Sequence, residues 1–363
     1  MRVAILARGM RRVGGVGRLL NGYVRHLPLV SPGDEFFVIT DSPLPDQWRA
    51  PNLKEIVLAR ANPAIFDHIE VPQAVKRITP DVFLAMKNSV PVGLRCPVVC
   101  TFLDLACFAM ADAYPVIDNL YMRAMFKHSA RLACRIVAIS RSTRDDVGRF
   151  LGRQAYEKTR IVHPGVSDVF RPLDEHDRRE ARKRLPGLPE RFVLYAGNIS
   201  PRKNIPRLLE AASTAAPDVG LVLTGHRIWK ARNFRRLVKT ASKRRAIKVL
   251  GTLPDEDLVA LYSLAEASVY PSLYEGFGFP VLESFACGAP VAASNATAIP
   301  EVAGDAAVLF DPTDVAAMSE AIGRLLRDST LRAELREKGL KRAAEFTWRR
   351  SSEGLLEVLR EVA

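Results

Sequence analysis

The sequence predicts an α/β fold of two doubly wound domains, each with a parallel sheet between two layers of helices. The chain has 363 residues, which suits two domains of about 100–200 residues each. Short β-branched runs alternate with longer helical patterns along its whole length. Some of these runs, including residues 98–100 and 221–223, are apolar on both faces. A strand covered by helices on both sides requires that pattern.

The strands fall into two successive series along the chain. Those predicted in the first half are residues 3–7, 36–40, 56–58, 82–84, 98–102, 136–140 and 161–163. Those predicted in the second half are residues 192–196, 221–224, 248–250, 267–270, 291–293 and 307–310. In folds of this kind, ligands bind at the carboxyl ends of the strands, so we look for the site there.

A turn-rich segment, residues 164–172, marks the boundary between the two domains. We therefore assign residues 1–170 to the first domain and residues 171–347 to the second. The last segment, residues 348–363, repeats apolar side chains at helical spacing and has no strand after it. A helix of this kind has to bury its apolar stripe, and we expect it to cross back to the first domain.

The chain is basic, with a formal net charge of +13. Residues 1–172 carry 24 Lys+Arg and 15 Asp+Glu, a balance of +9, and the remaining residues carry +4. A basic excess indicates anionic partners, namely phosphorylated substrates, an acidic membrane face or nucleic acid, or else only an Arg-rich solvated surface. Nine Lys and Arg with no acid lie in residues 230–248. Apolar residues at helical spacing there favour a solvated helix face, so nucleic acid is not an expected partner.

Other features of the sequence exclude several classes. No stretch approaches the roughly 20 apolar residues that span a bilayer. The apolar run at the N-terminus is too short for a signal peptide, so we expect a cytoplasmic protein. The five cysteines form no C-x-x-C pair, which argues against structural zinc and a disulfide framework.

The most informative stretch is residues 270–283, Y-P-S-L-Y-E-G-F-G-F-P-V-L-E. A predicted strand ends in it, a loop with two glycines follows, and Pro280 stands where a helix can begin. Backbone N–H groups around residues 276–281 are then expected to be unpaired and to face an anionic or polar ligand. Gly276 and Gly278 let such a ligand approach the backbone closely.

Two carboxylates in this stretch have different surroundings. Glu275 stands in the loop, and Glu283 lies about one turn inside the predicted helix. They can contact two parts of one extended ligand, since carboxylates bind sugar hydroxyls through charge-assisted hydrogen bonds. The alternative is structural, with Glu275 capping the helix and Glu283 on the surface. Their apolar neighbours favour the binding role, because an isolated buried carboxylate is costly.

Arg202 and Lys203 follow the first predicted strand of the second domain, within A-G-N-I-S-P-R-K-N (residues 196–204). Two adjacent cations at the carboxyl end of a strand suit a diphosphate, because Arg offers a planar fork and Lys a point charge. They would also stabilise the negative charge that develops on a leaving nucleoside diphosphate. The alternative is a basic turn on the surface.

The glycines of residues 14–18, G-G-V-G-R, follow the first predicted strand and precede a helix. With Asp41 after the next strand, they could form a dinucleotide fingerprint, which would indicate an NAD(P)-dependent oxidoreductase. Against that hypothesis, Leu20 replaces the third glycine of G-x-G-x-x-G, and the loop after Ala7 is long and basic.

Together these motifs resemble the retaining glycosyltransferases of family four, whose signature is a Glu followed by seven residues and a second Glu. The segments I-P-E-V-A-G-D-A-A (299–307) and F-T-W-R-R-S-S (346–352) are also similar to that family, so the resemblance covers the whole chain. It implies the GT-B architecture, in which two Rossmann-like domains face a central cleft. It also implies transfer of a hexose, and we expect mannose from GDP-mannose. The acceptor would be a glycan or polyprenyl-linked molecule, as in cell-surface polysaccharide assembly.

The resemblance assigns roles to particular residues. The expected catalytic residues are Arg202, Lys203, Glu275 and Asp104. The expected donor-binding residues are Gly15, Gly197, Leu253, Gly276, Phe277, Gly278 and Glu283, with Glu283 on the nucleotide ribose and the turn at Leu253 beside the base. The expected acceptor contacts are Arg8, Arg11, Ser140 and Arg141.

The chain departs from the family pattern after the strand at residues 98–102. Many relatives have His-Asp there, whereas this chain has Leu103 followed by Asp104. The loss of that His indicates a different donor sugar, an altered acceptor geometry or reduced activity, and it motivates the alternative of a catalytically silent sugar-nucleotide binder.

The resemblance implies no cofactor and no metal, because Arg202 and Lys203 would do the work of a cation. The expected partners are a nucleotide sugar and the acceptor. The basic first domain adds an expected peripheral contact with the inner face of a membrane.

Overall fold

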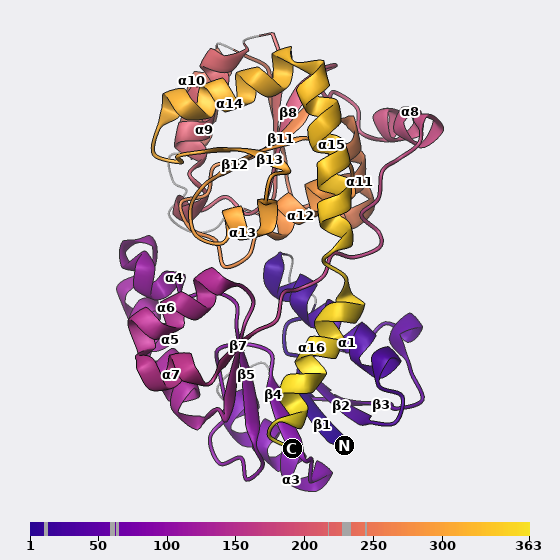
Figure 1. Ribbon diagram of the computed structural model, residues 1–363, viewed down its shortest axis with the longest axis vertical. Helices are drawn as coiled ribbons and strands as arrows, with labels where there is room; N and C mark the ends of the chain where they lie inside the picture. The colour runs from indigo at the N-terminus through magenta and orange to yellow at the C-terminus, as the bar shows by residue number, and fades with distance from the viewer. Residues whose placement is uncertain (11–13, 59–61, 63–64, 217, 227–233, 244) are drawn as a thin grey trace. The chain divides into compact units, whose positions relative to one another are not determined.

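The computed structural model describes residues 1–10, 14–58, 62, 65–216, 218–226, 234–243 and 245–363 (Figure 1). It divides into two compact units. Unit 1 consists of Met1–Gly165 and Phe346–Ala363, and unit 2 is Val166–Glu345. Each unit is built on a parallel sheet, so the predicted α/β class is confirmed.

The chain leaves unit 1 five residues earlier than the sequence predicted and returns to it two residues earlier. The reason is aromatic packing on either side of the boundary. Phe170 is buried and contacts Tyr262 of unit 2, with ring centroids 6.2 Å apart. The Phe346 ring lies 5.8 Å from the ring of His163 in unit 1. Each phenylalanine therefore belongs to the unit whose core it joins.

The sheet of unit 1 has seven strands in the order β3-β2-β1-β4-β5-β6-β7 among the described residues. The strands are β1 (Arg2–Leu6), β2 (Glu35–Thr40), β3 (Leu53–Val57), β4 (Val82–Ala85), β5 (Val98–Phe102), β6 (Arg135–Ala138) and β7 (Thr159–Ile161). All are parallel. The order reverses between β1 and β4, because the chain builds β2 and β3 on one side of β1 and then the later strands on the other.

The helices of unit 1 cover this sheet. They are α1 (Gly15–Val30), α3 (Val71–Ile78), α4 (Ala106–Ala109), α5 (Val116–Leu132), α6 (Arg141–Leu151), α7 (Arg153–Glu157) and α16 (Trp348–Arg360). Short 3-10 turns lie at η1 (Asp46–Trp48) and η3 (Ala111–Ala113), and η2 (Phe66–Glu70) is a π-helical turn. The core is formed by fully buried strand residues such as Ala4, Phe83 and Cys100.

The sheet of unit 2 has six strands, all parallel, in the order β10-β9-β8-β11-β12-β13 within the described part of the unit. The strands are β8 (Phe192–Ala196), β9 (Gly220–Thr224), β10 (Ile247–Leu250), β11 (Ala267–Tyr270), β12 (Val291–Ser294) and β13 (Ala307–Phe310). Here the order reverses between β8 and β11. In doubly wound sheets, such a reversal opens a crevice at the carboxyl ends of the two strands, where ligands bind.

The helices of unit 2 include two that begin directly behind this reversal, α9 (Ile205–Ala215) and α12 (Phe279–Ala286). The 3-10 turn η4 (Pro201–Lys203) precedes α9. The remaining helices are α8 (Glu175–Arg184), α10 (Phe234–Ala241), α11 (Asp255–Leu264), α13 (Ile299–Ala303), α14 (Val315–Arg327) and α15 (Ser329–Ala344).

The C-terminal helix α16 packs against α1 within unit 1 (Figure 1). Trp348 lies over Gly22 of α1 and makes an edge contact with Tyr23, with ring centroids 5.3 Å apart. The Ser351 hydroxyl donates a hydrogen bond of 2.9 Å to the Tyr23 hydroxyl. Arg360 at the far end of α16 forms an ion pair with Asp34 at 3.3 Å. Aromatic, hydrogen-bonded and ionic contacts thus fix the end of the chain to the start of the fold.

Gly22→Ala is expected to lower the free energy of unfolding, although alanine favours helix more than glycine does. A Cβ at Gly22 would lie 2.3 Å from Trp348 ring atoms, so the indole has to move. Overpacking of this kind costs about 1–3 kcal/mol. The matched control is Gly33→Ala, because a Cβ there meets nothing within 4 Å. Guanidinium unfolding followed by tryptophan fluorescence measures both variants, and a Gly22→Ala protein as stable as the control contradicts this packing.

Candidate active site

The loops after β8 and β11, at the reversal of unit 2, bring together three charged side chains predicted from the sequence. Arg202 and Lys203 lie in η4, and Glu275 lies in the loop between β11 and α12. Arg202 Nη1 donates to Glu275 Oε2 at 3.0 Å. The Lys203 ammonium donates to Glu275 Oε1. We call this group the Arg202–Lys203–Glu275 cluster, and the formal charges of its three side chains sum to +1.

The cluster is buried at Lys203 and Glu275 and more open at Arg202. Burial by itself raises the pKa of Glu275, but the charges of Lys203 and Arg202 outweigh it. Hydrogen bonds from Lys203 and from the Ser272 hydroxyl, the latter 2.7 Å long, act in the same direction. The net result lowers the pKa of Glu275 to about 2, so its carboxylate is ionised at neutral pH.

Backbone contacts hold the two loops against each other. The Leu273 N–H donates to the Arg202 carbonyl at 2.8 Å, and Arg202 Nη1 also donates to the Tyr274 carbonyl at 3.0 Å. Asn204 adopts a left-handed conformation with φ of 58°. Its side-chain amide donates to the carbonyl of Pro271 at 3.1 Å. These hydrogen bonds therefore join the η4 turn to the loop after β11.

The start of α12 differs in part from the prediction. Gly278 is the N-cap with φ of 121°, a conformation that favours glycine, and the helix begins at Phe279, so Pro280 is its second residue. The Val281 N–H donates to the Gly278 carbonyl at 2.9 Å. The expectation that the backbone N–H groups are unpaired as far as residue 281 is therefore wrong at Val281, because a tight first turn uses that donor.

Glu283 lies within α12, about one turn from its start, and is buried. The Tyr262 hydroxyl of α11 donates to Glu283 Oε2 at 3.1 Å. Burial raises the pKa of Tyr262 well above its usual value, so it remains a protonated donor. The two predicted carboxylates thus have different partners: cations for Glu275 and a tyrosine hydroxyl for Glu283.

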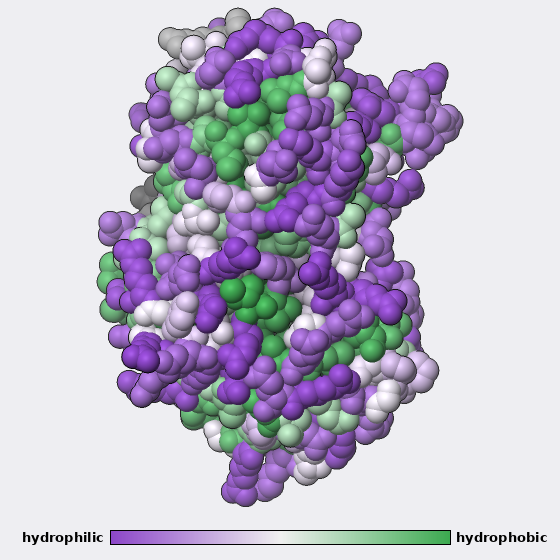
Figure 2. Space-filling model, viewed as in Figure 1, coloured by the Kyte–Doolittle hydropathy of each residue, from purple (hydrophilic) through white to green (hydrophobic). Residues whose placement is uncertain are grey.

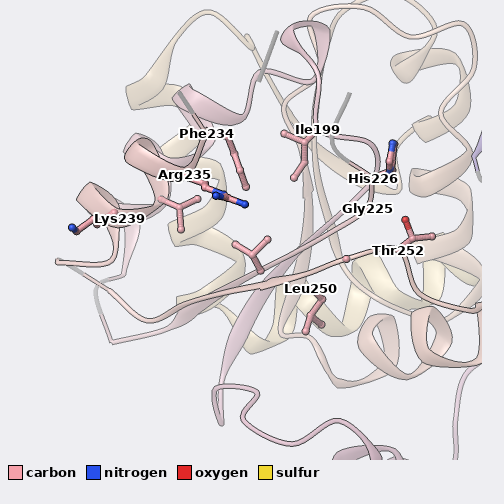
Figure 3. A pocket seen from close by; sticks show the side chains of 11 residues that line it. Ile199, Gly225, His226, Phe234, Arg235, Lys239, Leu250 and Thr252 are labelled. Carbon is pink, nitrogen blue, oxygen red and sulfur yellow. The ribbon is translucent and has the colours of Figure 1, made fainter. Parts of the chain in front are cut away.

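A cavity of about 650 Å³ lies on the same side of the unit 2 sheet, where β8, β9 and β10 end (Figure 3). Figure 3 shows Ile199 and Phe234 facing it, with His226 and Thr252 at another part of its wall. Apolar and polar side chains both line it, as is common in small-molecule sites. Of the predicted donor residues, Gly197 and Leu253 do not line it, although Gly197 is joined through its N–H to Thr224 at the end of β9.

In unit 1, two of the predicted site residues have structural partners. Asp104 follows β5, and its Oδ1 accepts a hydrogen bond of 3.1 Å from the Ala106 N–H at the start of α4. Ser140 is the buried N-cap of α6, where its hydroxyl accepts from the Thr143 N–H at 3.0 Å. Arg141, the next residue, is exposed. A helix-capping Ser140 is an ordinary use of that residue type.

Arg8 follows β1, next to the reversal of the unit 1 sheet. Its Nη2 forms an ion pair with the buried Asp67 at 2.7 Å, and its guanidinium lies 5.6 Å from the centre of the Phe66 ring. Lys87, after the neighbouring β4, donates to the Arg8 carbonyl at 2.7 Å. Burial raises the pKa of Asp67, although Arg8 opposes the shift. The partner Asp67 carries no sequence motif, so only the structure reveals it.

The glycine loop of unit 1 is described in part. Gly15 is the first residue of α1, after Gly14 with φ of 101°. Arg11, and Arg12 beside it, lie outside the described residues. Asp41, which the oxidoreductase hypothesis included in a dinucleotide fingerprint, accepts a hydrogen bond of 3.0 Å at its Oδ1 from the Gly9 N–H. That carboxylate therefore supports the loop after β1.

Several residues beside the site were missed by the sequence interpretation. Ser272 and Thr297 support Glu275, the latter by accepting a hydrogen bond of 2.9 Å from the Glu275 N–H. Tyr262 holds Glu283, and His226 lines the cavity. Ser272 could have been found, because it stands three residues before Glu275 in a loop. Thr297 and Tyr262 come from distant segments and gave no signal.

No group of three or more His, Cys, Asp and Glu side chains among the residues that the structure describes could hold a metal ion. No helix formed by them is both long and apolar enough to cross a bilayer.

Residues 177–342 match the family described as glycosyl transferases group 1. The chain is 35% identical over 256 residues to the O-antigen chain mannosyltransferase B of Escherichia coli, a match that covers 69% of this chain and 66% of that protein. The chain thus spans just under two thirds of this relative. It spans 31% to 32% of three serotype-specific mannosyltransferases from the same species.

Two solved structures share the fold. A sucrose-phosphate synthase from Thermosynechococcus elongatus has a TM-score of 0.80 and 21% identity, covering 99% of this chain and 98% of that one. The Anabaena protein HepE in complex with UDP-glucose has a TM-score of 0.79 and 17% identity, covering 99% and 100%. These likenesses confirm the predicted GT-B fold class. The relatives and structures found give no support to the oxidoreductase hypothesis.

Proposed function

Because residues 177–342 match the glycosyl transferases group 1 and the chain resembles a mannosyltransferase over 256 residues, we propose that it transfers a hexose from a nucleoside diphosphate sugar to an acceptor hydroxyl. Mannose is our choice of sugar, since the relative with 35% identity is named a mannosyltransferase. The acceptor class is a glycan or a polyprenyl-linked molecule of cell-surface polysaccharide assembly. The observation that carries the proposal is the Arg202–Lys203–Glu275 cluster at the reversal of the unit 2 sheet.

In this proposal, the diphosphate of the donor binds at Arg202 and Lys203. The cluster has a net charge of +1 and lies at the carboxyl ends of β8 and β11, where doubly wound sheets bind ligands. A diphosphate competes with Glu275 for Lys203. The displaced Glu275 carboxylate then accepts hydrogen bonds from hydroxyls of the donor sugar, while the loop of Gly276, Phe277 and Gly278 surrounds that sugar.

The two cations also supply the catalytic effect. As the bond to the sugar breaks, negative charge grows on the leaving diphosphate, and fixed positive charges stabilise it most at that moment. We propose that no metal is required for this reason. We further propose retention of anomeric configuration by a front-face reaction in which the departing phosphate takes the proton of the acceptor hydroxyl.

The remaining parts of the donor are assigned to neighbouring residues. Glu283, held by Tyr262, accepts hydrogen bonds from the ribose hydroxyls. The nucleotide base occupies the cavity beside Gly251 and Thr252 (Figure 3), next to the turn that contains Leu253. In unit 1, Arg8 contacts the acceptor and Asp67 holds the guanidinium in place.

Glu283→Gln is expected to weaken nucleotide binding by about 1.5–3 kcal/mol, the scale of a hydrogen bond to a charged group. Glutamine keeps the shape of the side chain and an acceptor for the Tyr262 hydroxyl, so the core around α12 is preserved. Calorimetric titration with GDP measures the change. Tyr262→Phe is the companion variant, since it removes the support of Glu283 and leaves the carboxylate. Equal affinity of the Glu283→Gln and unmodified proteins for GDP rules out the ribose contact.

The donor is identified by thermal shift with UDP, GDP, ADP and their sugars, because a bound ligand raises the melting temperature by mass action. We expect GDP-mannose to give the largest rise. The stabilising donor is then incubated with and without candidate acceptors, in the presence of EDTA, and the anomeric configuration of the product is read by NMR. Binding without donor turnover under all conditions would instead favour the silent binder that Leu103 suggests. No shift with any nucleotide contradicts the proposal.

A further inference from the structure

The helix α5 of unit 1 presents apolar side chains on the side that faces solvent. Val116 and Ile117 are 74% and 81% exposed, and Leu120 and Tyr121 are 63% and 60% exposed. In an α-helix, residues four positions apart lie on one side, so these four form one continuous strip over two turns. A helix on the surface of a globular protein normally has polar residues there.

The opposite side of α5 is already packed into unit 1, so the apolar strip does not serve the core. Phe126 is buried and contacts Phe102 of β5, with ring centroids 4.9 Å apart. Ser129 is buried and donates to the Asn88 carbonyl at 2.9 Å. Asn119 is buried and its side-chain amide donates to the Ala111 carbonyl at 2.9 Å. These contacts hold the helix in place, and its exposed apolar side takes no part in them.

The second half of α5 continues this outward side with positive charge. Lys127 and Arg131 are exposed and lie on the same side as Val116 and Leu120, at spacings of four and seven residues along the helix. The acid of α5, Asp118, lies at the edge of the strip and is outnumbered by Arg123, Lys127 and Arg131. Figure 2 shows green apolar surface on the left edge of unit 1, where Figure 1 places α4 and α5. We call this combination of apolar strip and basic end the α5 face.

We propose that the α5 face docks unit 1 on an anionic membrane surface. The chemistry of the face matches the two layers of such a surface. Exposed apolar side chains of the first turns enter the boundary between head groups and acyl chains, and the basic residues of the last turns contact anionic head groups. The formal charge of +9 over residues 1–172 attracts the same surface from a distance. An apolar patch of this kind commonly marks an interaction site.

The inference rests on the proposed function in one respect only. A polyprenyl-linked acceptor lies in a bilayer, so an enzyme that glycosylates it gains from being held there. The docking itself requires neither donor nor acceptor, and its test contains neither. Failure of the docking proposal therefore leaves the transferase proposal standing, and the reverse also holds.

The test is co-flotation of the full chain with vesicles of phosphatidylcholine alone and of phosphatidylcholine mixed equally with phosphatidylglycerol. We expect binding to the anionic vesicles and little to the neutral ones. The double substitution Ile117→Gln, Leu120→Gln is expected to lower the partition coefficient between anionic vesicles and water by on the order of tenfold. The matched control is Leu29→Gln, Val92→Gln, which removes two exposed apolar side chains of unit 1 outside α5 and is expected to bind like the unmodified chain.

The basic end is tested by the double substitution Lys127→Gln, Arg131→Gln. We expect this variant to bind anionic vesicles more weakly, and we expect its binding to depend less on salt concentration than that of the unmodified chain. All substituted residues are exposed, and circular dichroism verifies that each variant is folded. Absence of binding to anionic vesicles overturns the proposal, and so does equal binding by the α5 and control variants. Sedimentation velocity tests whether a second copy of the chain covers the α5 face instead. If the full chain is a dimer and the Ile117→Gln, Leu120→Gln substitution dissociates it, the α5 face serves self-association and the membrane proposal is overturned.

Discussion

Lys203→Ala is expected to lower kcat by on the order of 100-fold, the effect of removing one group that stabilises transition-state charge. Lys203 is buried and forms an ion pair with Glu275 at the carboxyl edge of the unit 2 sheet. Its positive charge is fixed before the donor arrives, so no reorganisation is needed when charge develops on the leaving diphosphate. The effect should fall on kcat more than on KM, because the charge on the diphosphate grows as the reaction proceeds.

The loss of Lys203 also leaves Glu275 buried with one partner fewer, which can weaken the fold. Lys203→Met separates the two effects, since it keeps the length and volume of the side chain without the charge. Lys341→Ala is the control for loss of a lysine, as Lys341 is exposed and paired with Glu337 on α15. A melting curve first shows that each variant is folded, and steady-state kinetics then compares the kcat of the variants. If Lys203→Met has the kcat of the unmodified protein, Lys203 has no role in the reaction.

Glu275→Gln is expected to destabilise unit 2 by about 3 kcal/mol at pH 7. The pKa of Glu275 is about 2 in the folded chain, against a usual value of 4.5. Because the folded value is the lower one, the ionised carboxylate stabilises the fold fully above pH 4.5. That stabilisation is lost as the pH falls from 4.5 towards 2, where the unfolded chain takes up the proton first.

Urea unfolding at a series of pH values from 7 to 3 measures this dependence. The difference in stability between the unmodified protein and Glu275→Gln should shrink as the pH falls below 4.5. Glu337→Gln is the matched control, because Glu337 also pairs with a lysine, at 2.6 Å, but is exposed. Exposed pairs contribute little to stability. A difference that stays constant over the whole pH range contradicts the ion-pair account of Glu275.

The strands were largely predictable because the sheets are parallel and buried. Each of the thirteen predicted runs overlaps a strand of the structure, and residues 98–102, 192–196, 267–270 and 307–310 have the predicted limits. Such strands are apolar on both faces and end in polar turns, so their limits are visible in the sequence. The strand β3 begins three residues before its predicted start, and β7 lies two residues before its predicted position, because both are edge strands that contain charged residues.

The site was predictable as a set of residues but not as a set of contacts. The cations after β8 and the carboxylates after β11 could be placed near each other from strand order alone. The sequence assigned Glu275 to a sugar, however, and the structure pairs it with Arg202 and Lys203. Thr297 lies 22 residues from its partner Glu275 in sequence, and Tyr262 lies 21 residues from its partner Glu283. Proximity of that kind depends on how the helices pack, which no local pattern encodes.

The α5 face could not be predicted from the sequence. Its apolar residues are visible in the sequence, but periodicity does not say which of two apolar sides of a helix is buried. Only the contacts of Asn119, Phe126 and Ser129 show which side packs inward. The exposed side is the basis of the docking proposal.

The most direct test of the central claim is a crystal structure of the protein with GDP-mannose bound. Our account predicts the diphosphate within hydrogen-bonding distance of Arg202 and Lys203, the ribose at Glu283 and the base beside Thr252. A well-ordered donor whose phosphates contact neither Arg202 nor Lys203 would contradict it.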